Sequence, residues 1–78
     1  MTLLNATKNQ LYLISSISEC DEAIKSRFFQ LGFIPGREIL LKRKAPFFGD
    51  PLLVEIDDSQ IALTKSEANL IQIQNLEA

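Results

Sequence analysis

Hydrophobic and polar residues alternate along several short stretches of this 78-residue chain. A period of two is typical of strands that bury one face and expose the other. The pattern predicts strands at residues 11–17, 37–45 and 52–56, a hairpin return at 61–64, and a closing strand around Ile71 and Ile73. Residues 65–68 are long enough for one helical turn before that closing strand.

The alternation also predicts which face of each strand is buried. At 11–17, the odd positions Leu11, Leu13 and Ile17 form one apolar face, with Tyr12 and Ile14 on a partly covered second face. The inward positions expected in the later strands are all aliphatic: Ile39, Leu41, Leu52, Val54, Ile56, Ile61 and Leu63.

One segment has the spacing of a helix. The Ser-x-x-Asp pattern that begins at Ser18 predicts the helix N-cap. Apolar residues then recur at helical spacing at Ala23, Ile24, Phe28 and Leu31. Gly32 is suited to a left-handed conformation after the last turn, and we expect Phe33 to fold back onto that turn.

The sharp corners of the backbone are expected between Leu31 and Pro51, because all three glycines and all three prolines lie there. Pro35 and Gly36 fit the central pair of a type II turn. We therefore assign structural turn roles to Gly32, Pro35, Gly36 and Pro51, and a shaped loop to residues 46–51.

These elements predict a single domain, residues 1–78, with residues 1–10 as a weakly ordered lead-in. Leu3 and Leu4 either dock as a half turn or fray with the terminus. A five-stranded sheet of this length exposes two edges unless it curls and closes. The predicted fold is mainly β with minor α: a small SH3-like barrel of about five strands, with one helix inserted after the first strand.

Composition excludes several classes of function. The chain has no histidine and one cysteine, which removes Ser–His and Cys–His nucleophile pairs and most transition-metal sites. Its net charge of −2 argues against nucleic-acid binding. No apolar run approaches the roughly 18 residues of a membrane span, and no signal pattern opens the chain. We expect a cytoplasmic protein that is not an enzyme, carries no cofactor and does not insert into the membrane.

With these elements placed, the chain resembles the FeoA family over roughly residues 17–74. The residues that carry the resemblance are Leu31-Gly32-Phe33-x-Pro35-Gly36, Ile39-x-Leu41, Ala45-Pro46, Gly49-Asp50-Pro51, Ile61-Ala62-Leu63, Glu67-Ala68 and Ile71-x-Ile73. Two departures from the family pattern stand out. Phe47 and Phe48 fill a loop position where the family usually has one residue, and Thr64-Lys65 follows a strand after which the family tends to carry Arg.

The resemblance implies a small cytosolic protein of bacterial ferrous iron transport that has no catalytic activity. Its implied partner is FeoB, the membrane iron permease with a cytosolic GTP-binding domain. The same domain also stands at the end of some iron-dependent repressors, and it is often labelled as metal-associated. The resemblance therefore implies an accessory role, with a weaker link to transition-metal binding.

Candidate partner-binding residues lie at the loop and on the strand before it. Adjacent aromatics on a loop tip do not easily both point inward, so Phe47 or Phe48 could anchor an interface, or both could cap the barrel. Lys42 and Lys44, expected to share an outward face, could meet an acidic surface or form a solvated edge. The candidate set is Lys42, Lys44, Pro46, Phe47, Phe48, Gly49 and Asp50.

Two acidic features favour structural explanations. Asp57 and Asp58 could accept a hard cation, but they lack the spacing of a dedicated calcium loop and fit a turn. Cys20 could bind ferrous iron with Asp21 and Glu22, although a buried structural thiol fits the position better. No metal site is assigned.

The function predicted from these residues is a non-enzymatic accessory protein that docks on the cytosolic part of a FeoB-type permease. Alternatives are a metal-linked regulatory module acting with a separate repressor, and a general protein-interaction barrel. An RNA-binding barrel is disfavoured by the acidic charge balance. Self-association into a homo-oligomer is left open.

Overall fold

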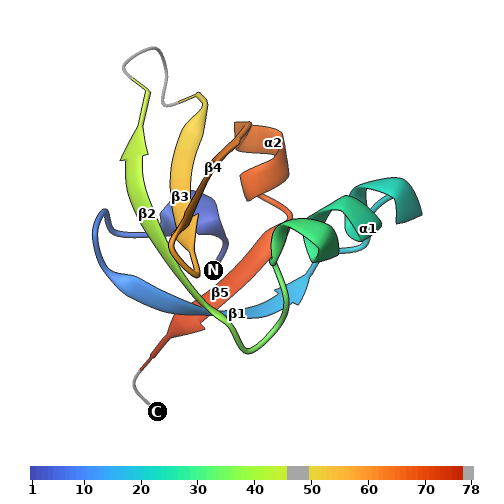
Figure 1. Cartoon of the computed structure of the whole chain (residues 1–78), viewed down its shortest axis with the longest axis horizontal. Coiled ribbons are helices and arrows are strands. Elements are labelled where there is room, and N and C mark those ends of the chain that lie inside the picture. The colour runs from blue at the N-terminus through green and yellow to red at the C-terminus, as the bar shows by residue number, and fades with distance from the viewer. Residues whose placement is uncertain (46–49, 77–78) are drawn as a thin grey trace.

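The computed structural model describes residues 1–45 and 50–76. It contains a 3-10 helix, five strands and two helices (Figure 1). Their bounds are η1 Leu3–Asn5, β1 Leu11–Ile17, α1 Glu22–Leu31, β2 Glu38–Lys44, β3 Leu52–Ile56, β4 Ser59–Leu63, α2 Lys65–Ala68 and β5 Ile71–Asn75. A mainly β fold with a helix inserted after the first strand is confirmed.

The five strands form one sheet in the order β4-β3-β2-β1-β5, and all neighbours are antiparallel. The prediction that the sheet closes into a complete barrel is wrong, because the backbone hydrogen bonds between strands leave it open at one place. No ladder joins β4 to β5 in the described part of the chain, because α2 starts directly after β4 and takes the chain out of the sheet there. The result is a curled sheet with one unpaired seam (Figure 1).

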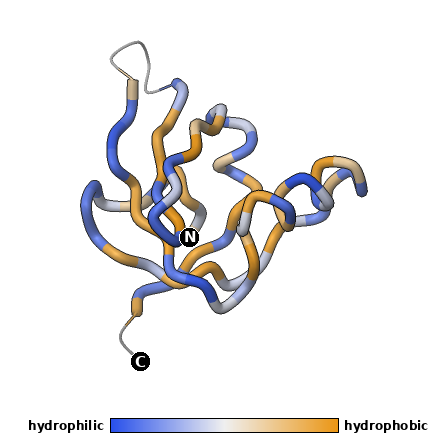
Figure 2. The backbone as a smooth tube through the Cα atoms, in the orientation of Figure 1, coloured by the Kyte–Doolittle hydropathy of each residue, from blue (hydrophilic) through white to orange (hydrophobic). Residues whose placement is uncertain are grey.

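The core fills the inside of this curl, and Figure 2 shows hydrophobic segments recurring along its strands. The most completely buried large side chains come from every strand, from η1, and from α1 and the residues just after it: Leu3, Tyr12, Ile14, Phe28, Phe33, Ile39, Leu41, Leu52, Val54, Ile56, Leu63 and Ile71. The inward aliphatics predicted for the later strands are confirmed, with Ile61 only partly buried. Burial of this set is the main source of stability for so small a domain.

The face assignment of β1 is wrong. Tyr12 and Ile14 are buried in the core, whereas Leu11 on the opposite face is 43% exposed. Both faces of this strand are apolar, so the alternation could not decide between them. The hydroxyl of Tyr12 accepts a hydrogen bond of 2.8 Å from the N–H of Thr7, which satisfies its polar end.

The N-cap of α1 is Asp21, not Ser18 as predicted. The Asp21 carboxylate accepts a hydrogen bond from the Ala23 N–H at 3.1 Å. Ser18 is instead hydrogen-bonded to β5 and to the residue before it. Its N–H donates to the Leu70 carbonyl at 2.8 Å, and its hydroxyl accepts from the Gln72 side chain at 2.8 Å. Because these contacts hold Ser18 in line with β1, it is unavailable as a cap.

The helix stop has the predicted form. Gly32 has φ of +99° and donates to the Phe29 carbonyl, and the Phe33 N–H donates to the Phe28 carbonyl at 2.9 Å. The rings of Phe28 and Phe33 pack edge to face with centroids 5.6 Å apart. Phe33 therefore folds back onto the last turn and carries the helix end into the core.

The turn at Pro35 and Gly36 is also confirmed. Gly36 has φ of +95°, and the Arg37 N–H donates to the Ile34 carbonyl at 3.1 Å across the turn. The Gly36 N–H donates to the Ile14 carbonyl at 2.8 Å. This bond fixes the turn against β1, so that β2 starts in register.

The hairpin between β3 and β4 is tighter than predicted. Asp57 and Asp58 have φ of +49° and +67° and form a two-residue turn, so Ser59 pairs with Ile56. For this reason β4 begins at Ser59 rather than at Ile61. Thr64, expected to be the last strand residue, instead caps α2.

The N-terminal segment forms a docked half turn, the first of the two alternatives for Leu3 and Leu4. Thr2 and Asn5 cap η1 reciprocally, and Leu3 is fully buried. The Ile73 N–H donates to the Met1 carbonyl at 2.9 Å. This segment therefore lies along part of the outer edge of β5.

Candidate functional site

Four of the candidate partner-binding residues, Pro46, Phe47, Phe48 and Gly49, lie outside the described residues. The structure places the two ends of their loop. The Ala45 N–H donates to the Pro51 carbonyl at 2.9 Å, so the loop leaves and returns at adjacent positions of β2 and β3. The carbonyl of Pro51 thus closes the base of the loop, and a turn role specific to its proline ring stays a prediction.

Asp50 is exposed at the base of the loop, and its carboxylate is already engaged. It accepts a hydrogen bond of 3.1 Å from the backbone N–H of Lys65, the first residue of α2. A carboxylate near the first N–H groups of a helix is favoured by the local dipole. This contact links the loop base to α2.

The basic run on β2 does not have the predicted pleat. The pairing register with β3 shifts between Leu41 and Arg43, which leaves Lys42 as an extra residue in a bulge. Beyond the bulge, Arg43 pairs with Leu53 and Lys44 pairs with buried Leu52. Lys42 and Lys44 therefore do not share an outward face, and Arg43 takes the outer one.

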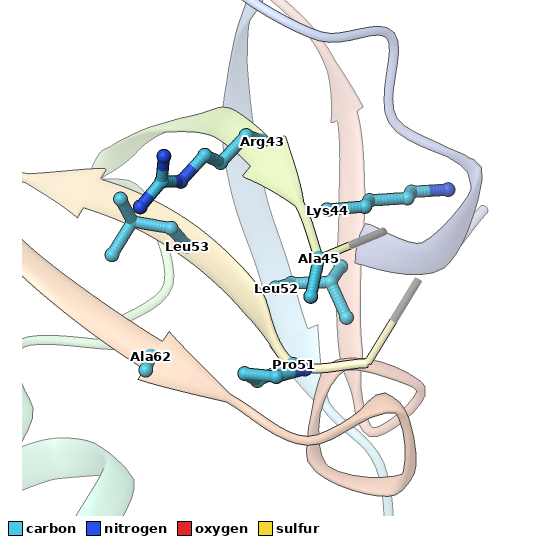
Figure 3. A pocket seen from close by; sticks show the side chains of 7 residues that line it. All are labelled: Arg43, Lys44, Ala45, Pro51, Leu52, Leu53 and Ala62. Atoms are coloured by element: carbon cyan, nitrogen blue, oxygen red, sulfur yellow. The ribbon is translucent and has the colours of Figure 1, made fainter. Parts of the chain in front are cut away.

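The two side chains beyond the bulge point in different directions (Figure 3). Lys44 extends toward the N-terminal segment, where its ammonium donates to the Leu4 carbonyl at 3.2 Å. Arg43 reaches across Leu53 on the outer face of the sheet. Because of the bulge, Arg43 rather than Lys44 presents its charge on the outer face of the sheet.

An open cleft of about 320 Å³ lies beside Arg43 at the loop end of β2 and β3. Apart from Arg43 and Lys44 at its rim, its walls are aliphatic (Figure 3). The lining residues are Arg43, Lys44, Ala45, Pro51, Leu52, Leu53 and Ala62. Because the Lys44 ammonium is directed to Leu4, Arg43 supplies the charge at the rim, and such an apolar hollow suits an apolar side chain that has an acidic neighbour.

Two of the carboxylates considered as cation ligands, Asp57 and Asp21, have other partners. The Asp57 carboxylate pairs with the Arg37 guanidinium at 3.1 Å, an exposed contact that adds little stability. Asp21 caps α1, and Cys20 beside it is half-buried. Among residues 1–45 and 50–76, no group of three or more Cys, Asp or Glu side chains is arranged to hold a metal ion.

A second ion pair connects the two helices. Arg27 on α1 contacts Glu67 on α2, and Glu67 also accepts from the Thr64 N–H at 2.9 Å. Glu67 therefore belongs to the cap of α2 and to the link between helices. Within the described residues, no helix is long and apolar enough to span a membrane.

Sequence reasoning missed Arg43, Leu53 and Ala62 as site residues. Simple alternation places Arg43 on the face opposite Lys42 and Lys44, and nothing in the neighbouring sequence signals the bulge that directs its side chain across Leu53. Leu53 and Ala62 are small or aliphatic residues whose pairing creates the floor of the cleft. Only the register between strands, which the sequence does not show, brings these three together.

Comparison with known proteins gives a consistent set of relatives. The model of the FeoA domain family matches residues 1–75. A Helicobacter pylori protein named as a Fe(2+) transport protein A is 37% identical over 78 residues, which cover 95% of this chain and 96% of that protein.

Solved structures agree in fold. FeoA of Stenotrophomonas maltophilia, a prokaryotic SH3 domain protein complexed with zinc, has a TM-score of 0.83 and 32% identity over 95% of this chain and 89% of its own. Iron(II) transport protein A from Clostridium thermocellum has a TM-score of 0.87 and 30% identity, covering 97% of this chain but 46% of that one. The SH3-like class predicted from the sequence is confirmed.

Proposed function

Since the chain belongs to the FeoA domain family, we propose that it is a small non-enzymatic accessory protein of ferrous iron transport. It acts in the cytoplasm by docking on the cytosolic GTP-binding part of a FeoB-type permease. The names of the Helicobacter and Clostridium relatives support the link to iron transport. Docking on a FeoB-type permease is what the resemblance to the family implies.

The observation that carries this proposal is the cleft at the loop end of β2 and β3. It offers an apolar floor at Leu53 and Ala62 with Arg43 at its rim, in a chain whose net charge is negative. A local cationic rim on an acidic protein favours a partner with a complementary acidic surface. The loop that carries Phe47 and Phe48 begins and ends beside this cleft.

Docking would regulate the permease by differential affinity. A bound accessory protein shifts the balance between two states of its partner only as far as it binds one state more tightly than the other. No chemical step by this chain is required. The expected role is therefore to scaffold the permease or to bias it toward one conformation.

The test is a calorimetric titration of the full chain into the cytosolic domain of the cognate permease. We expect saturable binding that weakens at least about tenfold when Phe47 and Phe48 are both replaced by Ala, because interface aromatics carry much of the binding energy. Phe29→Ala is the matched control, since Phe29 is an aromatic 47% exposed on α1, away from the cleft. Absence of binding by the unaltered chain would disprove docking.

A further inference from the structure

Strand β4 has one edge without a strand partner. It lies at one end of the sheet order and pairs only with β3. In a hairpin with a two-residue turn, Ile56 and Ser59 form a hydrogen-bonded pair and the next pairs alternate. The N–H and C=O groups of Gln60 and Ala62 therefore point away from β3, toward the unpaired edge.

These backbone groups are available to another chain. Gln60 and Ala62 are both exposed, and in the described part of the chain no backbone group bonds to either of them outside the ladder with β3. The other end of the sheet differs, because Met1 and Thr2 lie against β5 at Gln72 and Ile73. The structure thus protects one edge and leaves the other as a template for strand addition.

Four apolar residues cross the outer face beside this edge, next to Glu55 and Arg43. Pairing between strands places Leu11 beside Leu40, and Leu53 beside Ala62, on the same face. Leu40 and Leu53 are diagonal neighbours, because both flank Glu55 on that face. We call this set, Leu11, Leu40, Leu53 and Ala62, the outer stripe. It crosses β1 to β4 and ends at the cleft.

Charge indicates what kind of segment the edge would accept. Arg43 reaches across Leu53, near the end of the outer stripe. A strand added to β4 would place a side chain opposite Ala62 on the outer face, where the small alanine leaves the cleft open. A carboxylate on the same face of that strand would complement Arg43.

We propose that β4 binds an extended segment of an acidic partner as a sixth strand. The segment pairs with the backbone of Gln60 and Ala62, inserts an apolar side chain into the cleft and pairs a carboxylate with Arg43. This inference rests on the proposed docking function and specifies how docking occurs. A second copy of this chain is a poorer occupant, because β4 and β5 contain no carboxylate to meet Arg43.

Hydrogen exchange measured by NMR on the full chain, free and bound to the cytosolic domain of the cognate permease, tests the pairing directly. We expect the amides of Gln60 and Ala62 to exchange at least about tenfold more slowly in the complex, because strand addition bonds them. The amides of Leu53 and Glu55, which face β2, serve as the internal control. Binding that leaves Gln60 and Ala62 unprotected would overturn strand addition but not docking. Absence of binding would overturn both.

Two substitutions give a second test with matched controls. Ala62→Pro removes the outward N–H without removing a bond to β3, and we expect it to weaken binding about tenfold or more. Ala62→Ser keeps this N–H and should bind as tightly as the unaltered chain.

The second pair tests the charge. Arg43→Glu should weaken binding by a similar factor, while Lys25→Glu on α1 should leave the affinity unchanged. If circular dichroism shows that Ala62→Pro does not fold, the comparison of Arg43→Glu with Lys25→Glu tests the proposal in its place. Equal affinity of Arg43→Glu and Lys25→Glu would overturn the proposal.

Discussion

At the scale of single residues, two glycines hold backbone angles that other residues avoid. Gly32 ends α1 at φ of +99° and Gly36 turns the chain into β2 at +95°. A β-carbon on Gly32 would lie 3.4 Å from the Arg37 guanidinium and 3.6 Å from Ile56, whereas one on Gly36 would meet nothing within 4 Å. At both sites the backbone angle, rather than a lack of space, is therefore what favours glycine.

We predict that Gly36→Ala lowers the free energy of unfolding by about 1 kcal/mol, because alanine is strained at positive φ. Gly32→Ala should lower it by a similar amount, because a β-carbon there meets Arg37 and Ile56 only at ordinary contact distances and the strain again comes from the backbone angle. Thermal unfolding by circular dichroism measures both, and a loss of about 1 kcal/mol lowers the Tm by roughly 4–8 °C in a domain of this size. Unchanged Tm values would show that neither corner needs glycine.

At the scale of elements, α2 is a single turn that depends on its cap. The Thr64 hydroxyl accepts from the Glu67 N–H at 3.1 Å, and the Glu67 carboxylate accepts from the Thr64 N–H at 2.9 Å. So short a helix has little stability without such bonds. The cap also positions Lys65, whose N–H bonds to Asp50 at the base of the loop.

We predict that Thr64→Ala destabilises the protein by about 1 kcal/mol, since it removes the N-cap acceptor. Thr64→Ser keeps the hydroxyl and should retain most of the stability. Urea unfolding monitored by circular dichroism gives the comparison. Equal unfolding midpoints for the alanine and serine variants would contradict a stabilising role for the cap.

The elements also show how far the sequence predicts the fold. Alternation located β3 at its observed bounds, and Gly32 with Phe33 located the end of α1, because these signals act within a few residues. Ser18 was misassigned because its true partners, Leu70 and Gln72, are more than 50 residues away. The bulge at Lys42 and the buried face of β1 likewise depend on pairing with distant strands.

At the scale of the whole molecule, the distribution of charge favours one orientation of the protein on the proposed partner. The chain carries a net charge of −2, yet the rim of its cleft is cationic through Arg43. An overall negative charge disfavours non-specific contact with an acidic partner, and the cationic rim favours one orientation. The candidate site could not be placed from sequence, because strand register assembles it.

We predict that the affinity for the cytosolic domain of the permease falls about tenfold between about 50 and 500 mM NaCl, because salt screens exposed charge pairs. The loss should appear mainly in the association rate. Surface plasmon resonance at several salt concentrations separates the two rates. An affinity independent of salt would show that Arg43 and its neighbours do not contribute.

The central claim is that this protein acts by binding through the outer face of its sheet near the loop end of β2. A map of amide chemical-shift changes on adding the cytosolic domain of the cognate permease tests it most directly. The account predicts that the largest changes fall at Arg43, Leu53 and Ala62 and fade toward α1. Changes confined to α1, or no changes at saturating partner, would contradict it.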